Sequence, residues 1–174
     1  MDSYLELYLK ELEELPAYTE EEIGEAKQKA VSGDDKDAQD ILMNHYLRSV
    51  VDIARTYVDH QVPAEDLIGE GNIGMMTAIR ALATLESPEE VDGFVGGLIM
   101  DAMDAAVYED NEVRESMQVM VDRINEINDR AKELSGDMRR SVTVAELAQE
   151  TEISEDEIRQ AMRMAGGQIE GLVP

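Results

Sequence analysis

Apolar residues in the first half of the chain recur three and four positions apart, the spacing that places side chains on one face of an α-helix. The first of these stripes consists of Tyr4, Leu5, Tyr8, Leu9 and Leu12. Ser3 stands before it as a candidate cap, and Pro16 ends it. Longer patterns predict helices from Lys36 to about His60 and from Pro63 to about Leu85.

Several helix starts are marked by a hydroxyl residue followed three positions later by Glu, the pattern of a capping box. In this motif the hydroxyl accepts a hydrogen bond from the helix backbone, and the glutamate accepts one from the cap residue. The chain carries the motif at Thr19–Glu22, Thr143–Glu146 and Ser154–Glu157, and a related start signal, Ser87-Pro88-Glu89-Glu90, with Pro at the first helical position. Each predicts a new helix, and Gly33-Asp34-Asp35 predicts a turn and a further cap.

The second half of the chain divides into several predicted helices. The helix after Ser87 is expected to run to about Tyr108, with polar breaks at Asp110-Asn111-Glu112 and at Gly136-Asp137. Two short helices near residues 145–150 and 155–165 have the size of a helix-turn-helix pair, and the tail is expected to be loose. No segment alternates like a strand. The chain is therefore predicted to be all-α, with one domain over residues 1–111 and a small three-helix domain over residues 112–174.

The chain is strongly acidic, and its few basic residues are unevenly placed. Its 174 residues include 40 acidic and 15 basic side chains, which gives a net charge of −25. Between Gln61 and Asp110 the only basic residue is Arg80. Because contact with nucleic-acid phosphates depends mainly on Lys and Arg, this segment is poorly suited to DNA binding.

Composition also limits the other classes of function. Without cysteine there is no disulfide framework and no thiolate metal site. His45 and His60 have no second ligand at metal spacing and no nucleophile motif is present, so we expect neither an enzyme nor a cofactor. The first residues do not resemble a signal peptide, and no apolar run is long enough to cross a membrane. These features predict a soluble cytoplasmic protein.

The segment Leu67–Met76, with the letters LIGEGNIGMM, contains the most informative motif. Residues 69–74 fit the G-x-G-x-x-G pattern of dinucleotide-binding loops, which follows a buried strand and opens a helix. Here Pro63 begins a helix ahead of the motif, and no strand precedes it. We therefore expect these glycines to lie within a helix and to bind no nucleotide.

The same letters belong to a longer signature. Asp66-Leu67-Ile68-x-Glu70-Gly71-Asn72-Ile73-Gly74-x-Met76 resembles the polymerase-binding helix of bacterial RNA polymerase sigma factors of the major, housekeeping-type family. The resemblance is collinear from about Tyr4 to Ala165 and covers the core and linker domains of the family. It implies the all-α core fold of a sigma factor, followed by a linker domain whose last helices are similar to residues 143–165.

The resemblance implies a partner, core RNA polymerase, bound through a coiled coil of its largest subunit. Carried over residue by residue, the contact positions are Asp66, Leu67, Glu70, Asn72 and Met75. Asp66 and Glu70 are four residues apart and project from one helical face, where two carboxylates can meet a basic ridge. Gly69 departs from the family, which usually has Gln there.

The next predicted helix departs from the family where promoter DNA would be read. The resemblance places the DNA-reading positions at Tyr46, Phe94, Gly97, Leu98, Met100, Asp101 and Asp104. Phe94 keeps an aromatic ring where the family stacks on a promoter base, but Gly97 and Leu98 replace two tryptophans. The carboxylate of Asp101 would repel phosphate and cannot donate a hydrogen bond to a base. We expect promoter recognition to be weakened or lost.

Two functions of different classes agree with these residues. The first is a sigma-factor-like regulator of transcription initiation that binds core RNA polymerase, with little or no promoter recognition of its own. It would compete with true sigma factors or need a second sigma-like subunit. The alternative is an acidic helical adaptor, or a DNA mimic, that binds a basic groove on another protein. A continuous acidic patch at Asp92, Asp101 and Asp104, with the Asp66 face buried, would favour the alternative.

Overall fold

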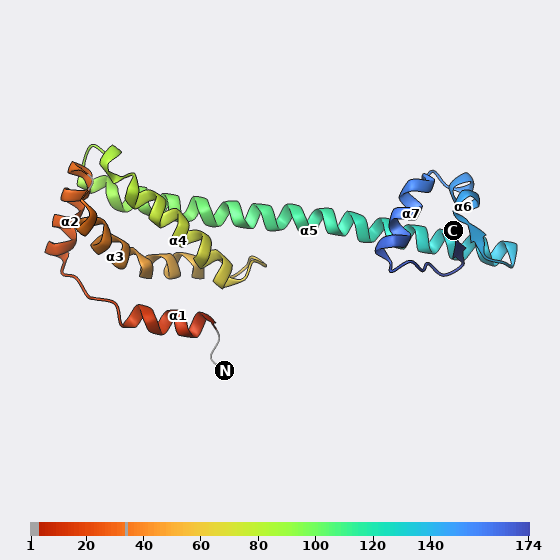
Figure 1. Ribbon diagram of the computed structural model, residues 1–174, viewed down its shortest axis with the longest axis horizontal. Helices are drawn as coiled ribbons and strands as arrows, with labels where there is room; N and C mark the ends of the chain where they lie inside the picture. Colours follow the sequence, from red (N-terminus) through yellow and green to blue (C-terminus); the bar gives the residue numbers. More distant parts are fainter. Residues whose placement is uncertain (1–3, 34) are drawn as a thin grey trace. The chain divides into compact units, whose positions relative to one another are not determined.

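The structure, a computed structural model, describes residues 4–33 and 35–174 of the chain. It confirms the all-α fold class (Figure 1). The helices of the described residues are α1 (Tyr4–Glu13), α2 (Glu20–Ser32), α3 (Lys36–Ala54), α4 (Ala64–Arg80), α5 (Val91–Met138), α6 (Val144–Glu150) and α7 (Glu155–Met164). Short 3₁₀ turns lie at Arg55–Tyr57, Leu82–Thr84 and Pro88–Glu90. The candidate cap Ser3, and Asp34 of the predicted turn, lie outside the described residues.

The chain forms two compact units, Met1–Asn111 and Glu112–Pro174, each with its own apolar core. In the first unit α3 packs against α2 and α4, and the beginning of α5 joins them (Figure 1). The fully buried side chains of this core include Leu42, Leu67, Ile79, Leu82, Ile99 and Met103. In the second unit α6 and α7 cover the last part of α5, and Ile127, Leu147 and Ile158 are fully buried between them.

Local capping chemistry sets most of the helix starts, as the sequence predicted. Complete capping boxes form at Thr19, Thr143 and Ser154. At Thr19 the hydroxyl accepts a hydrogen bond of 3.2 Å from the Glu22 backbone, and the Glu22 carboxylate accepts one of 2.8 Å from the Thr19 backbone. The helix start predicted after Ser87 is confirmed, although α5 is entered through a 3₁₀ turn that begins at Pro88 and Ser87 makes no cap bond.

The predicted break at Asp110-Asn111-Glu112 is wrong, because α5 continues through it as one helix of 48 residues. Asp and Asn have only modestly lower helix propensity than other residues, a difference of less than about 1 kcal/mol each. The segment contains neither Pro nor Gly. The helix ends instead at Met138, two residues beyond Gly136, and Arg139 follows with a left-handed backbone angle φ of 53°. Polar residues alone were therefore insufficient to stop the helix.

The expectation of a loose tail without strands is also wrong. Leu172–Val173 (β2) pairs in parallel with Val142–Thr143 (β1), and the Val142 N–H donates to the Gly171 carbonyl at 2.9 Å. The pairing brings Leu172 into the core of the second unit. Strands of two residues are too short to show an alternating pattern, which explains why the sequence did not predict them.

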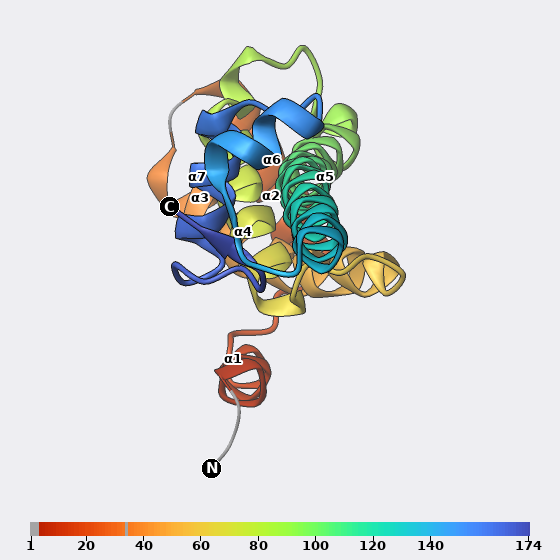
Figure 2. The same ribbon diagram turned by 90° about the vertical axis from the view of Figure 1, so that its right-hand side faces the viewer.

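Helix α1 lies at the edge of the first unit, as both views show (Figure 1 and Figure 2). Its Leu12 is buried, and the Leu12 carbonyl accepts a hydrogen bond of 3.2 Å from the Arg48 guanidinium of α3. Leu5 and Leu9 are partly buried against the same core. The helix is thus attached through one apolar stripe, as its periodicity predicted. None of the described helices combines the length and the apolar character needed to cross a membrane.

Candidate functional site

Helix α4 contains the whole glycine-rich motif, and two of its glycines serve helix packing. A Cβ added at Gly74 would lie 2.4 Å from the Leu98 carbonyl oxygen of α5. A Cβ added at Gly71 would lie 2.3 Å from the Met103 side chain and 2.8 Å from that of Val50. These contacts are closer than real Cβ atoms come. Because the contact at Gly74 is with backbone, only glycine allows α4 to approach α5 this closely there. The motif is therefore a packing element, and the expectation that it forms no nucleotide loop agrees with its place inside a helix.

The opposite side of α4 is exposed and carries two of the predicted contact residues. Asp66 and Glu70 both lie on the surface, one helical turn apart. Ile73 continues the same line of side chains and is 54% exposed. The space around Gly69 is open, since an added Cβ would have no neighbour within 4 Å. This exposed line, Asp66, Glu70 and Ile73, is called the α4 face below.

Three of the predicted contact residues are not part of the α4 face. Leu67 and Met75 are each only 2% exposed and pack in the core of the first unit. Asn72 is half-buried, and its Nδ2 donates a hydrogen bond of 3.1 Å to the Tyr8 hydroxyl of α1. Leu67 and Met75 therefore hold α4 in place, whereas Asn72 attaches α1. The spacing of Leu67, Gly71 and Met75, four residues each, was the signal that could have shown this inward face.

The predicted base-pocket residue Tyr46 is buried in a polar network that joins three helices. Its hydroxyl donates a hydrogen bond to the Asp92 carboxylate at the start of α5. The ammonium of Lys27 on α2 forms an ion pair with the same carboxylate at 2.7 Å. In the sequence Asp92 is separated from Tyr46 by 46 positions and from Lys27 by 65, so no local pattern could have revealed the network.

Protonation of this network follows from burial and its partners. Burial opposes ionisation of Asp92, but the hydrogen bonds from Lys27 and Tyr46 outweigh it and lower the pKa of the carboxyl. Burial and the Asp92 carboxylate raise the pKa of the Tyr46 hydroxyl far above its ordinary value. Burial, together with the nearby Lys27 charge, lowers the pKa of His45. At neutral pH Tyr46 is therefore a phenol and Asp92 a carboxylate, and Asp92 forms an ion pair with Lys27.

The remaining predicted DNA-reading positions lie near the start of α5, and two of them carry carboxylates. Met100, Asp101 and Asp104 are exposed, while Phe94 and Leu98 are partly buried against the core. Gly97 has open space beside it. The Tyr57 hydroxyl donates a hydrogen bond of 2.6 Å to Asp104. Burial, followed by this hydrogen bond, raises the pKa of Tyr57 to about 12.

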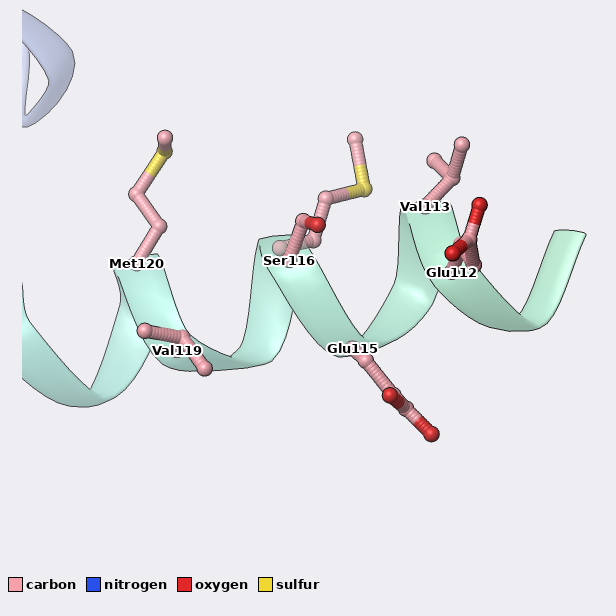
Figure 3. Close-up of a pocket in the computed structure, with 7 residues that line it drawn as sticks. Glu112, Val113, Glu115, Ser116, Val119 and Met120 are labelled. Carbon is pink, nitrogen blue, oxygen red and sulfur yellow. The ribbon is translucent and has the colours of Figure 1, made fainter. Parts of the chain in front are cut away.

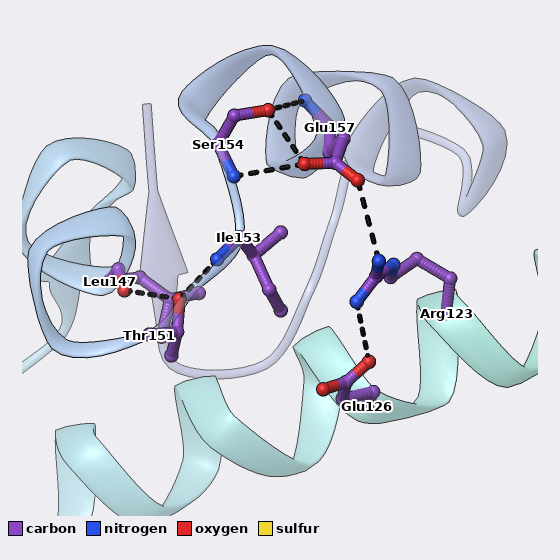
Figure 4. A network of polar contacts seen from close by, with 7 residues as sticks. All are labelled: Arg123, Glu126, Leu147, Thr151, Ile153, Ser154 and Glu157. Carbon is purple, nitrogen blue, oxygen red and sulfur yellow. Dashed lines mark hydrogen bonds and ion pairs between the residues drawn. The ribbon is translucent and has the colours of Figure 1, made fainter.

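Two arginines of the second unit form ion pairs with acidic side chains. Arg123 of α5 lies 2.8 Å from a Glu126 oxygen and 3.5 Å from a Glu157 oxygen of α7 (Figure 4). Arg140 and Glu146 form an ion pair of 2.6 Å. Hydrogen bonds from Arg140 and Thr143 lower the pKa of Glu146 to about 2. Among the described residues, no group of three or more His, Cys, Asp or Glu side chains is arranged to hold a metal ion.

Comparison with known proteins identifies two family segments in chain order. The sigma-70 region 2 family model matches residues 42–88, and the sigma-70 region 3 model matches residues 122–168. Together they cover more than half of the chain. The intervening residues 89–121, outside both matches, include Phe94, Gly97, Leu98, Met100, Asp101 and Asp104. The part of α5 that we predicted to depart from the family pattern thus lies outside both matches.

Curated relatives extend the similarity over nearly the whole chain. It is 28% identical over 159 residues to RNA polymerase sigma factor SigA of a Bacillus species, covering 91% of this chain and 42% of that protein. It is 27% identical over 165 residues to RNA polymerase sigma factor SigA of Clostridium acetobutylicum, covering 95% of this chain and 43% of that protein. The chain therefore spans less than half the length of these relatives. This similarity to sigma factors agrees with the expectation that the chain is not an enzyme.

The predicted resemblance is confirmed by these matches, and the helices that carry it fold as the family signature implies. Region 2 falls on α3 and α4 of the first unit, and region 3 falls on the end of α5 with α6 and α7 of the second. The chain belongs to the sigma-70 family of RNA polymerase sigma factors, of which it carries regions 2 and 3.

Proposed function

We propose that this chain is a sigma-factor-like regulator of transcription initiation that binds core RNA polymerase through the α4 face and recognises promoter DNA weakly or not at all. One observation carries the proposal. Within the region 2 match, Asp66 and Glu70 are exposed on α4, while the neighbouring helix α5 has no Lys or Arg before Arg114.

The α4 face has the chemistry that a basic helical partner would need. Asp66, Glu70 and Ile73 follow the spacing i, i+4 and i+7, so two carboxylates and one apolar side chain form a single line along the helix. Opposite charges across an interface speed encounter and fix orientation, and the exposed Ile73 adds apolar area to bury. The largest-subunit coiled coil of core RNA polymerase is the partner that we propose. Leu67 and Met75 contribute by holding the helix in place.

The weak promoter recognition that we propose follows from the charges at and around the predicted DNA-reading positions. The Tyr46 hydroxyl is hydrogen-bonded to Asp92, and the same carboxylate forms an ion pair with Lys27. Asp101 and Asp104 are exposed on α5, where a DNA-binding surface needs cations. Promoter contacts would then come from a competing sigma factor or from a second sigma-like subunit, which is a further candidate partner.

The alternative, an acidic adaptor or DNA mimic, is less well supported. It required a continuous acidic patch at Asp92, Asp101 and Asp104 together with a buried Asp66 face. Instead Asp66 is exposed, Asp92 is paired with Lys27, and Asp104 is bonded to Tyr57. The condition of a buried Asp66 face is therefore not met.

Polymerase binding is tested by capturing purified core RNA polymerase on the immobilised chain. The double substitution Asp66→Arg with Glu70→Arg should reduce the affinity at least tenfold, because it places like charges against a basic ridge. Glu21→Arg with Glu25→Arg on α2 is a matched control, since it reverses two exposed charges at the same spacing. Equal retention of both double variants, or no retention of the wild-type chain, would show that α4 does not bind polymerase.

Promoter recognition is tested separately by fluorescence anisotropy with a labelled promoter duplex and a scrambled duplex at physiological salt. The chain alone should not distinguish the two. Sub-micromolar, salt-sensitive binding that favours the promoter would contradict the charge argument.

A further inference from the structure

An apolar groove lies within the second unit, between α5 and α7. Val119, Met120 and Ile124 of α5 line one side, and Ala161 and Met164 of α7 line the other, around a volume of about 310 Å³. Val119 is 70% exposed, Met164 48% and Met120 37%. Large apolar side chains scattered singly over a surface are ordinary, but a contiguous exposed group at a groove marks a site of interaction.

The apolar surface continues from the groove along α5. Val113 and Met117 are also exposed, and with Met120 and Ile124 they follow steps of four, three and four residues. Figure 3 shows Val113 and Met120 on the same side of the helix, with Glu115 on the opposite side. From Val113 to Ile124 this stripe is about 16 Å long, which corresponds to about three helical turns. The surface therefore has the length of a short amphipathic helix.

The rim of the surface is acidic. Glu112 flanks the stripe on α5, and Glu157 flanks the groove on α7. The only cation among the groove-lining residues that the structure describes is Arg123, which is held by Glu126 and Glu157 (Figure 4). Among the residues that line the stripe and the groove, carboxylates outnumber cations, in a chain whose net charge is −25.

We propose that this α5–α7 groove is a docking site for a basic amphipathic helix of another protein. An amphipathic helix places its apolar residues at i, i+3, i+4 and i+7 into such a groove. The unbranched methionine side chains at the groove adapt to apolar partners of different shape. Basic residues on the partner would meet the acidic rim, which favours a cationic helix over a neutral or an acidic one. A second copy of this chain is disfavoured as the occupant, because two chains of charge −25 repel each other.

The groove is separate from the α4 face that we propose for polymerase. All of its lining residues belong to the second unit, whereas Asp66, Glu70 and Ile73 belong to the first. Substitutions in the groove should therefore leave polymerase capture unchanged, so that failure of either proposal can be seen independently of the other.

The test uses two labelled peptides of roughly fourteen residues, long enough to span the stripe as a helix. One has leucine on one face and lysine on the other, and the second has glutamate in place of lysine. The full chain should bind the lysine peptide and not the glutamate peptide in a fluorescence anisotropy titration. Equal binding of both peptides would contradict the role of the acidic rim.

Because a chain of this charge attracts any cationic peptide, the decisive comparison is between variants. Met120→Ser with Met164→Ser should weaken binding of the lysine peptide at least tenfold. The control, Met100→Ser with Met138→Ser, removes two methionines of similar exposure outside the groove and should leave the affinity within about twofold. Circular dichroism of both double variants checks that they are folded. Equal binding by the two would show only adventitious charge attraction and would overturn the proposal.

Two further measurements locate the occupant. With methyl-labelled methionine, the lysine peptide should shift the resonances of Met117, Met120 and Met164 and leave Met138 in place; shifts confined to other methionines would overturn the proposal. Light scattering should give a monomer for the wild-type chain. A dimer that Met120→Ser with Met164→Ser converts to monomer would show that a second copy occupies the groove instead.

Discussion

The close packing of α4 on α5 predicts that Gly74→Ala will destabilise the first unit. Gly74 faces the backbone of α5, where an added Cβ would lie 2.4 Å from the Leu98 carbonyl oxygen and 3.0 Å from the Ala102 Cβ. An ordinary van der Waals contact begins at 3.4 Å, so the two helices would have to separate by about 1 Å. A backbone carbonyl within a helix cannot rotate away as a flexible side chain can.

Two opposing free-energy terms set the size of the effect. Overpacking of a close-packed interior costs about 1–3 kcal/mol, whereas replacing a helical glycine by alanine gains about 1 kcal/mol. Because the contact is with backbone, we expect a net loss of about 1–2 kcal/mol for Gly74→Ala. Gly69→Ala is the matched control in the same helix. The Cβ added at Gly69 has no neighbouring atom within 4 Å, so this substitution should raise the free energy of unfolding by about 1 kcal/mol.

The chain provides its own probe for this experiment. It has no tryptophan, and all six tyrosines lie within residues 1–111, so tyrosine fluorescence during urea unfolding reports on the first unit alone. The unfolding midpoint of Gly74→Ala should fall below that of the wild type, and that of Gly69→Ala should rise above it. A Gly74→Ala variant as stable as Gly69→Ala would refute the packing role of the motif.

Three further predictions concern single polar groups. The pKa of Asp92 is lowered in the folded chain, so its stabilisation is present above its unfolded pKa of about 3.9 and is lost as the pH falls through the folded value. The free energy of unfolding, measured by tyrosine fluorescence, should therefore fall less for Asp92→Asn than for the wild type as the pH is lowered below about 4. Equal falls in the two proteins would contradict this. Thr143→Ala should reduce the hydrogen-exchange protection of α6 by about 1 kcal/mol, and unchanged protection would argue against the cap. Asp104→Asn should bring the pKa of Tyr57 down from about 12 in an ultraviolet titration, and an unshifted phenol would exclude their hydrogen bond.

Local chemistry in the sequence predicted much of the fold. The hydroxyl and glutamate of each complete capping box lie three residues apart, so helix starts at Thr19, Thr143 and Ser154 were visible without tertiary information. The ends of helices were harder to place. Asp110-Asn111-Glu112 is polar, yet the apolar stripe continues beyond it, and the small propensity differences did not stop α5.

Features that depend on distant residues were not predictable. Val142 and Leu172 pair across 30 positions in strands of only two residues, and Tyr46 meets Asp92 across 46 positions. The candidate site was predicted in part. Family positions identified α4 but did not distinguish the exposed Asp66 and Glu70 from the buried Met75, because side-chain direction depends on which helices pack against α4.

The central claim is that the chain keeps a polymerase-binding face and lacks effective promoter contacts. Size-exclusion chromatography of core RNA polymerase with the chain and a labelled promoter fragment tests both parts at once. We expect the chain to co-elute with core polymerase and the complex to retain no more promoter fragment than scrambled fragment. A chain that elutes apart from polymerase, or a complex that selectively retains the promoter fragment, would contradict the account.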